Sequence, residues 1–213
     1  MTLILHSYWR ATAPYRVRIG LNLKGLPYDY APVNLAAGEQ HGPYGQLNSQ
    51  HLTPALETDD GRVLTQSLAI LEWLEETHPN PPLLPAAPHE RAVVRAMAGI
   101  VACDIHPLNN LRIQKQLTEM GIDEAGRLAW TQRWIEDGFA ALEPLIAAHS
   151  DGFAFGAQPG LADCLLVPQV YSAERYGVDL LPYPAIAAVV ARCSEHPAFQ
   201  DAHPDRQPDA KPK

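Results

Sequence analysis

TPALETDDGRVLTQS, residues 53–67, contains two short apolar runs separated by a turn sequence. Ala55-Leu56 and Val63-Leu64 have strand composition, and Asp59-Asp60-Gly61 between them is typical of a tight turn. The stretch therefore predicts an antiparallel hairpin. A helix is expected directly afterwards, because Ser67 stands at the start of an apolar sequence with helical character and can cap it.

Towards the N-terminus, strand and helix signals alternate. Residues 3–8 (LILHSY) and 28–35 (YDYAPVNL) have strand composition, and residues 16–25 (RVRIGLNLKG) between them have helical spacing that ends at Gly25. Two strands joined by a helical crossover pair in parallel, with a right-handed connection. The predicted architecture of this part is a small sheet flanked by helices.

A proline-rich segment, residues 78–90 (HPNPPLLPAAPHE), divides the chain. Proline has no backbone donor and disfavours helix at the preceding residue, so this segment is expected to be extended and irregular. We therefore predict two domains with different secondary structure. The first is an α/β domain over residues 1–82, and the second is an all-helical domain over residues 89–213.

Nearly all of the second domain is expected to be helical. Proline is expected to cause a break or a kink at His106-Pro107 and a bend at Pro168. Residues 203–213 (HPDRQPDAKPK) are polar and proline-rich, so they are expected to wrap the surface or fray. The predicted helices cover residues 90–105, 124–149, 161–177 and 183–196.

Composition excludes several functional classes. The net charge is −8 and the 16 basic residues are dispersed, which argues against a nucleic-acid partner. No apolar run approaches the roughly 18 residues that a membrane span needs, so no membrane association is expected. Cys103, Cys164 and Cys193 are odd in number and form no CxxC pair, which favours reduced thiols in core positions of a cytoplasmic protein. No cluster of metal-ligating residues is apparent, so no metal is expected.

Segments along almost the whole chain match one known pattern: SYWR (7–10), RVRIGLNLKG (16–25), GEQH (38–41), TPAL (53–56), QSLAILEWLEE (66–76), PLLP (82–85), CDIHPLNNLR (103–112), LADCLLVPQVYSAERYGVDLLPYP (161–184) and HPDRQPD (203–209). Together they resemble the zeta class of cytosolic glutathione transferases, which comprises maleylacetoacetate isomerases and similar glutathione-dependent maleylpyruvate isomerases. The resemblance implies a thioredoxin-like α/β domain followed by an all-α bundle, glutathione as cofactor, a small dicarboxylate as substrate and a homodimer.

The chain departs from the zeta pattern where that class activates the glutathione thiol. After the strand arginine, here Arg10, the class usually has Ser-Ser-Cys, and this chain has Ala11, Thr12 and Ala13. The resemblance places Arg10, Ala11 and Thr12 at the catalytic positions. Backbone donors at a helix N-terminus, the charge of Arg10 and the hydroxyl of Thr12 are then expected to lower the thiol pKa. Gly160 is a second departure, where the class normally has a threonine or serine cap.

The glutathione site is expected around two segments of the first domain. If the thioredoxin-like reading holds, Thr53-Pro54 is a cis peptide that turns the Thr53 backbone toward the tripeptide, whereas an ordinary trans proline is the alternative. Gln66 and Ser67 precede a helix, whose N-terminus suits the γ-glutamyl carboxylate, although Ser67 could also serve only as a cap. The resemblance adds further glutathione-binding positions, namely Gln40, His41, Gln50, His106 and Asn110.

Three arginines match positions that face a dicarboxylate in maleylpyruvate-isomerising members: Arg10, Arg112 and Arg175. Arginine pairs with carboxylates through two parallel donors, although an isolated arginine is more often part of a surface ion pair. Arg16 and Arg18 lie within a predicted helix and are expected to support the fold.

The implied reaction is cis–trans isomerisation by reversible addition of the glutathione thiolate, with maleylacetoacetate as the favoured substrate. Maleylpyruvate remains an alternative, because the two substrates differ only in the length of the keto chain. A transferase acting on α-halo acids and a glutathione-binding protein without catalysis remain open as well. The alanines at positions 11 and 13 favour the non-catalytic alternative, whereas the three arginines speak against it.

Overall fold

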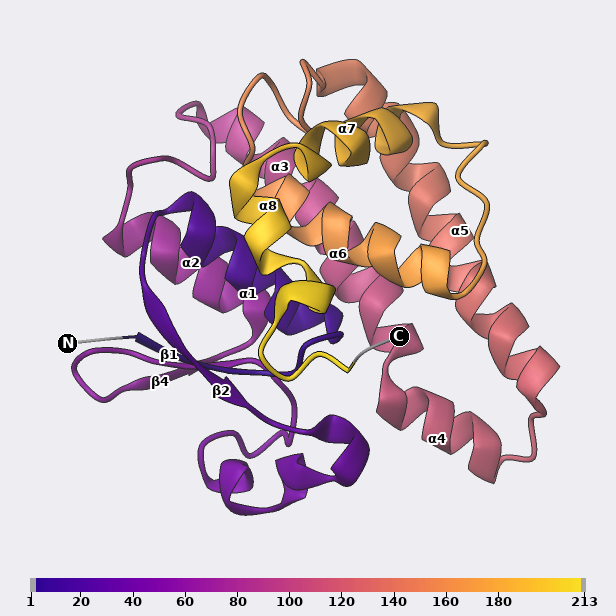
Figure 1. Cartoon of the computed structure of the whole chain (residues 1–213). Coiled ribbons are helices and arrows are strands. Elements are labelled where there is room, and N and C mark those ends of the chain that lie inside the picture. Colours follow the sequence, from indigo (N-terminus) through magenta and orange to yellow (C-terminus); the bar gives the residue numbers. More distant parts are fainter. Residues whose placement is uncertain (1–2, 212–213) are drawn as a thin grey trace. The chain divides into compact units, whose positions relative to one another are not determined.

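The structure is a computed structural model that describes residues 3–211. It divides into two compact units (Figure 1). The first unit contains the chain up to Leu83 together with the chain from Ser194 onward, and the second contains Leu84–Cys193. The helical domain was predicted to cover residues 89–213. The structure instead groups the segment from Ser194 onward with the first unit.

The first unit is built on a four-stranded sheet in the order β2-β1-β3-β4. β1 and β2 pair in parallel, as the helical crossover predicts, and β3 pairs antiparallel with both β1 and β4. The predicted hairpin is confirmed, with Leu56 opposite Leu64. The strands are β1 (Leu3–Ser7), β2 (Tyr28–Pro32), β3 (Ala55–Glu57) and β4 (Val63–Thr65).

Helices α1 (Thr12–Leu23) and α2 (Ser67–Thr77) pack against each other and lie on one side of this sheet (Figure 1). Their close approach depends on Gly20, because a Cβ atom at that position would lie 2.2 Å from a methyl carbon of Leu71. The crossover between β2 and β3 contains short 3₁₀ turns: Leu35–Ala37, Glu39–His41 and Pro43–Gln46.

The helix α8 (Pro197–Ala202) belongs to this unit because it packs on α1. Arg18 Nε donates to the Ala202 carbonyl at 2.9 Å, and Asn22 Nδ2 donates to the Ala198 carbonyl at 2.9 Å. These bonds satisfy two carbonyls of a short helix, in which most carbonyls have no partner within the helix. They explain why the end of the chain is grouped with its beginning.

A buried ion pair fixes the start of the proline-rich segment to the first unit. Lys24 Nζ at the end of α1 lies 2.7 Å from Glu75 Oε2 in α2. The same carboxylate oxygen accepts from the Leu83 backbone N–H at 2.7 Å, and Lys24 donates to the Pro81 carbonyl at 2.6 Å. Buried charges of this kind are stable only when paired and hydrogen-bonded, as both are here.

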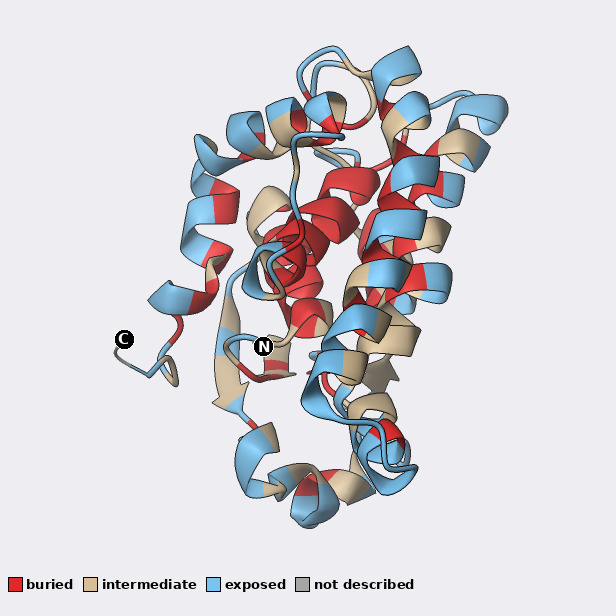
Figure 2. Ribbon diagram, turned by 90° about the vertical axis from the view of Figure 1, so that its right-hand side faces the viewer, coloured by how far each residue is buried: buried red, intermediate tan, exposed pale blue. Residues whose placement is uncertain are grey.

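The second unit is a helical bundle around α6, most of whose residues are buried (Figure 2). The predicted break is confirmed, since a π-helical turn, Ile100–Ile105, leads into a 3₁₀ turn, His106–Asn109. A short helix, α4, follows this break; the sequence did not predict it as a separate helix. The helices are α3 (Pro88–Gly99), α4 (Leu111–Glu119), α5 (Glu124–His149), α6 (Leu161–Arg175) and α7 (Pro184–Ser194).

The three cysteines are free thiols, as expected. Cys164 and Cys193 are buried, but Cys103 is exposed, so its predicted core position is wrong. Cys103 lies in the π-helical turn Ile100–Ile105. Within residues 3–211, no helix combines the length and the apolar character needed to cross a membrane.

Candidate active site

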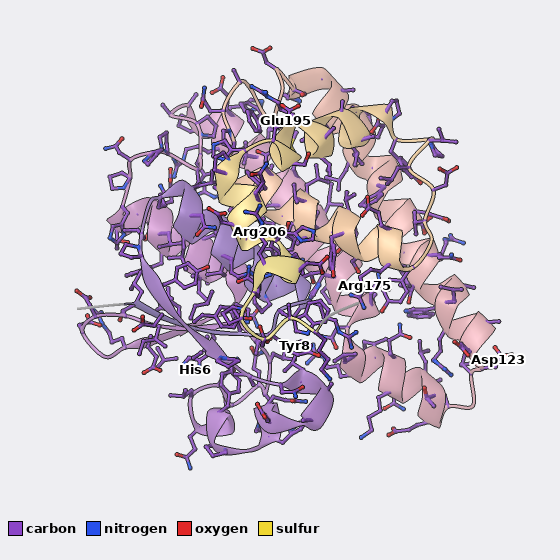
Figure 3. All side chains as sticks on the ribbon, in the orientation of Figure 1. His6, Tyr8, Asp123, Arg175, Glu195 and Arg206 are labelled. Atoms are coloured by element: carbon purple, nitrogen blue, oxygen red, sulfur yellow. The ribbon has the colours of Figure 1, made fainter. Side chains whose placement is uncertain are left out.

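A tight turn joins β1 to α1 at the position expected for thiol activation. The Ala11 backbone N–H donates to the Tyr8 carbonyl at 3.0 Å, and α1 begins at Thr12, which is 8% exposed. Ala11 is the N-cap of α1 and gives it no side-chain hydrogen bond. The first turn of α1 therefore presents its backbone donors with no cap side chain of its own, which is the arrangement that binds anions. Figure 3 labels Tyr8 at the start of this turn.

Arg10 is exposed and lies over the aromatic residues that precede it. Its guanidinium carbon is 5.9 Å from the centre of the Tyr8 ring and 5.7 Å from that of Trp9. Both distances fall near the outer limit of a cation–π contact. The exposed head group remains available for an anionic ligand.

The peptide Thr53-Pro54 is cis, as the sequence analysis predicted. Both residues are buried, and they lead directly into β3. The Thr53 hydroxyl is buried without a hydrogen-bond partner among residues 3–211. Unpartnered polar atoms of this kind are uncommon in folded proteins and call for an explanation.

The N-terminus of α2 brings several predicted residues together. Gln66 adopts a left-handed backbone (φ 69°, ψ 114°), a conformation that is uncommon for non-glycine residues and is enriched at functional sites. Its Nε2 donates to Gln50 Oε1 at 2.6 Å, although the two residues lie in different loops. Ser67 follows as the first residue of α2, is 5% exposed, and accepts a hydrogen bond from Arg16 Nη1 at 3.3 Å.

The loop before β3 places two histidines against each other. The ring centres of His41 and His51 are 5.0 Å apart, and His51 Nδ1 lies 2.9 Å from the Gln40 carbonyl. His51, like Gln66, has a left-handed backbone (φ 55°). The Gln40 side-chain oxygen is buried without a partner in the described part of the chain. His51 was not among the residues that sequence reasoning selected.

The second unit holds the remaining glutathione-binding candidates around the break in its helices. His106 begins the 3₁₀ turn, and Asn110 caps α4 by accepting the Arg112 backbone N–H at 2.9 Å. The preceding residue, Asn109, has a side chain whose nitrogen and oxygen are both buried without partners among the described residues. Sequence reasoning did not select Asn109.

The two arginines of this unit that are predicted to bind the substrate are both exposed. Arg112 is the second residue of α4, and Arg175 is the last residue of α6 (Figure 3). The Arg175 guanidinium carbon lies 5.7 Å from the centre of the Tyr171 ring and 5.9 Å from that of Tyr176. A cation at a helix C-terminus also interacts favourably with the helix dipole.

The helix arginines that we expected to support the fold are both fully or nearly fully buried. Arg18 is 0% exposed and binds groups of β1, the following turn and α8. Arg16 is 2% exposed and contacts Ser67, a candidate site residue. Arginine is rarely fully buried, so the residue type alone did not predict the burial of Arg16 and Arg18.

Comparison with known proteins identifies the family. The sequence profile of the glutathione S-transferase N-terminal domain matches residues 13–77. A maleylacetoacetate isomerase of Pseudomonas aeruginosa is 49% identical over 208 residues, covering 96% of this chain and 97% of that protein.

Two solved structures extend the comparison. One is the holo structure of maleylpyruvate isomerase, described as a bacterial zeta-class glutathione S-transferase, with a TM-score of 0.95 and 50% identity over 98% of this chain and 100% of that one. The other is a maleylacetoacetate isomerase of Anaeromyxobacter dehalogenans with bound dicarboxyethyl glutathione and citrate. Its TM-score is 0.90, with 46% identity over 99% of this chain and 98% of that one. The fold predicted from sequence is thereby confirmed, and the chain belongs to the zeta class of glutathione transferases, the family of the maleylacetoacetate and maleylpyruvate isomerases.

Proposed function

We propose that the protein is a glutathione-dependent cis–trans isomerase that converts maleylacetoacetate into fumarylacetoacetate. The observation that carries the proposal is the arrangement at the start of α2. Gln66 is held in a left-handed conformation and bound to Gln50, and Ser67 is buried at the helix N-terminus. This arrangement suits the γ-glutamyl carboxylate of glutathione, because a helix N-terminus combines free N–H donors with a partial positive charge.

The protein supplies no nucleophile of its own in the turn before α1. Ala11 and Ala13 are inert, so the attacking sulfur belongs to glutathione. The first backbone donors of α1 stabilise its thiolate, as they do for cysteine thiolates at helix N-termini. Arg10 adds a positive charge close by, and Thr12 offers a hydroxyl at the first helical position.

The reaction then proceeds by addition and elimination. The thiolate forms a C–S bond to one carbon of the cis double bond, and the electron pair of that bond moves into the adjacent carbonyl to give an enolate. The former double bond is now single and rotates. Collapse of the enolate breaks the C–S bond, restores the double bond as trans and returns the thiolate, so no oxidant or net proton is needed. Arg10, Arg112 and Arg175 pair with the substrate carboxylates and stabilise the developing enolate charge.

A ligand of the related Anaeromyxobacter protein supports this order of steps. That protein is named as holding dicarboxyethyl glutathione, a compound in which glutathione carries a group with two carboxyls. Such a compound has the connectivity that thiolate addition to a maleyl-type diacid produces. It supports both the nucleophile and the dicarboxylate class of substrate in our proposal.

Maleylpyruvate is the second candidate substrate. The related structure with a TM-score of 0.95 is named a maleylpyruvate isomerase, while the relative at 49% identity is named for maleylacetoacetate. Both substrates present the same maleyl group to the thiolate and differ in the remote keto chain. Assays with the two substrates in parallel, compared by kcat/KM, decide between them.

The proposal is tested with purified protein, glutathione and each maleyl keto acid, following isomerisation by ultraviolet absorbance. In Arg112→Ala and Arg175→Ala, kcat/KM is expected to fall about ten- to a hundredfold, the cost of one charge-assisted pair. Glutathione affinity should stay nearly unchanged. The matched control is Arg133→Ala, which removes an exposed arginine of α5 that is paired with Asp137. Wild-type protein that binds glutathione but isomerises neither substrate contradicts the proposal.

We further propose that the protein acts in the cytoplasm as a homodimer. Three free cysteines favour a reducing compartment, since disulfides are rare there. The dimer rests on the family resemblance. Light scattering of the purified protein measures the mass in solution, and a mass equal to one chain contradicts the dimer.

A further inference from the structure

Two successive peptide groups of the turn before α1 are held by charged side chains from elsewhere in the first unit. The Trp9 backbone N–H donates to Asp209 Oδ2 at 3.1 Å. The Trp9 carbonyl accepts from Arg18 Nη2 at 2.9 Å. These two bonds fix the orientation of the peptide groups before and after Trp9. Arg10 and Ala11 follow Trp9 in the chain, so the bonds also restrain the start of the turn.

Asp209 is itself held in place by the sheet. Its second carboxylate oxygen, Oδ1, accepts from the Tyr30 hydroxyl at 2.6 Å, and Tyr30 lies in β2. Burial raises the pKa of Tyr30, and the bond to Asp209 raises it further, so the phenol remains a neutral donor. One carboxylate thus joins a strand of the sheet to the turn.

Arg18 forms the opposite side of the same arrangement. It is 0% exposed, and besides Trp9 it donates to Ser7 Oγ at 3.1 Å and to the Ala202 carbonyl at 2.9 Å. A single buried cation therefore binds the end of β1, the turn and the end of α8. Burial lowers the pKa of Arg18, and the nearby tyrosines and Asp209 oppose this.

The segment that carries Asp209 is folded back rather than frayed. We call residues 203–209 the tail; Figure 3 labels Arg206 within it. The Gln207 side chain is buried, and its Nε2 donates to the carbonyls of Asp201 and His203, both at 2.9 Å. Pro204 is buried as well. These contacts hold the tail between the end of α8 and the turn.

We propose that the tail positions the thiol-activating turn, with Asp209 as the positioning residue that acts through Trp9. This inference rests on the proposed function, because the turn matters only if it presents donors to the glutathione sulfur. Without Asp209, the peptide between Tyr8 and Trp9 loses the bond at its N–H and keeps the bond from the Ala11 N–H to its carbonyl. The turn is then less restrained, and the backbone donors at the start of α1 no longer meet the sulfur in a fixed geometry. Small displacements of this kind cost a large factor in rate, about a hundredfold for 1 Å in favourable cases.

The test compares Asp209→Ala with Asp201→Ala in the full chain. Asp201 is a matched control, because its carboxylate, in α8, meets the tail in an exposed ion pair with Arg206 at 2.8 Å, and exposed pairs of this kind contribute little to stability. Three quantities are measured: hydrogen exchange of the Trp9 amide, the pKa of bound glutathione by thiolate absorbance, and kcat and KM against pH. Asp209→Asn keeps an acceptor for the Trp9 N–H and serves if the alanine variant does not fold.

In Asp209→Ala we expect faster exchange of the Trp9 amide, a raised thiol pKa and a loss of about tenfold in kcat near neutral pH. The loss should be greatest on the acidic side, where the thiolate fraction limits the rate, and Asp201→Ala should match wild type. Asp209→Asn should lie between the two.

Two results overturn the inference. One is faster Trp9 exchange with unchanged thiol pKa and kcat, and the other is an equal loss of kcat at every pH, which indicates only a smaller folded fraction. The proposed function is judged separately. If wild type fails to isomerise any maleyl keto acid, that function is wrong, whereas the thiol titrations of the two aspartate variants still decide whether the tail positions the turn.

Discussion

The buried guanidinium of Arg16 donates a hydrogen bond to the hydroxyl of Ser67, with 3.3 Å between Nη1 and Oγ. Arg16 lies four residues after Thr12 in α1, so the two residues share one face of that helix. Ser67 is the first residue of α2. A buried cation therefore connects the helix proposed to activate the thiol with the helix proposed to bind the γ-glutamyl carboxylate.

Ser67→Ala is expected to lower glutathione affinity about tenfold and to reduce the free energy of unfolding by about 1–3 kcal/mol, because it removes an acceptor from a buried charged donor. Titration calorimetry measures the affinity, and urea unfolding without glutathione measures the stability. The control is Ser172→Ala, which removes another buried helical serine, in α6. Full glutathione affinity in Ser67→Ala would remove Ser67 from the site.

The turn before α1 predicts how added or removed hydroxyls change thiol activation. Ala11→Ser supplies the hydroxyl that the zeta class usually has there, so the pKa of bound glutathione should fall and turnover at pH 6 to 7 should rise. Thr12→Ala should change both in the opposite direction. One neutral hydrogen bond contributes about 0.5–1.5 kcal/mol, which corresponds to a change of about two- to tenfold.

Ala13→Ser is the matched control for these variants, since it adds the same hydroxyl two residues further along the chain. Thiolate absorbance against pH and the pH dependence of kcat measure the effect. If neither Ala11→Ser nor Thr12→Ala changes the titration, the backbone donors and Arg10 activate the sulfur without help from a hydroxyl.

The Lys24–Glu75 pair predicts that substitutions of two adjacent glutamates, Glu75 and Glu76, have very different effects on stability. Glu75→Gln leaves the Lys24 ammonium, whose side chain is 0% exposed, without its counter-charge, and should destabilise the protein by about 3–5 kcal/mol. Glu76→Gln changes the exposed neighbour and should stay within about 0.5 kcal/mol of wild type. Urea unfolding of the three proteins provides the comparison, and equal stabilities would show that the buried pair contributes nothing.

Asp163 predicts a specific pH dependence of stability. Its carboxylate accepts from the backbone N–H groups of Ala154 and Gly160, both at 2.8 Å, and burial raises its pKa to about 6 from an ordinary value of 3.8. The folded state therefore binds a proton more tightly than the unfolded state. The stability that this group contributes is fully present below about pH 4 and is lost as the pH rises through about 6.

Asp163→Asn removes this titration. The variant should be less stable than wild type at pH 4, and the difference should shrink by up to about 3 kcal/mol between pH 4 and pH 7. Urea unfolding of both proteins at intervals of one pH unit measures the difference in stability. Taking the difference cancels the contributions of titratable groups that the two proteins share. A difference that does not change with pH would show that Asp163 keeps an ordinary pKa in the folded protein.

Local patterns predicted the elements whose signals are local. The hairpin between β3 and β4 was predictable because Gly61, which has a left-handed backbone (φ 79°), follows two aspartates between strand-like runs. The break at His106 was predictable because proline cannot continue a helix. The resemblance to the zeta class supplied the candidate residues of the site, and the contact between Gln50 and Gln66 brings two of them together.

The features that escaped prediction depend on contacts between distant residues. The tail was expected to wrap the surface or fray, because residues 203–213 are polar and rich in proline. The structure shows the tail packed rather than frayed, and its Asp209 bonds Trp9 and Tyr30, which precede it by 200 and 179 residues. No window of sequence contains both partners. The left-handed backbone of Gln66 was equally hidden, because side-chain type does not specify such a conformation outside glycine.

The first unit is interrupted in the chain by the helical unit, and this has a consequence for synthesis. The ribosome makes β1 to α2 before the helical unit and α8 only after it, so Arg18 and Asn22 have no Ala202 or Ala198 to bind until the chain beyond Ser194 has emerged. The helical unit is continuous and can fold while it is being made. The unit whose synthesis begins first is therefore the one that is completed last.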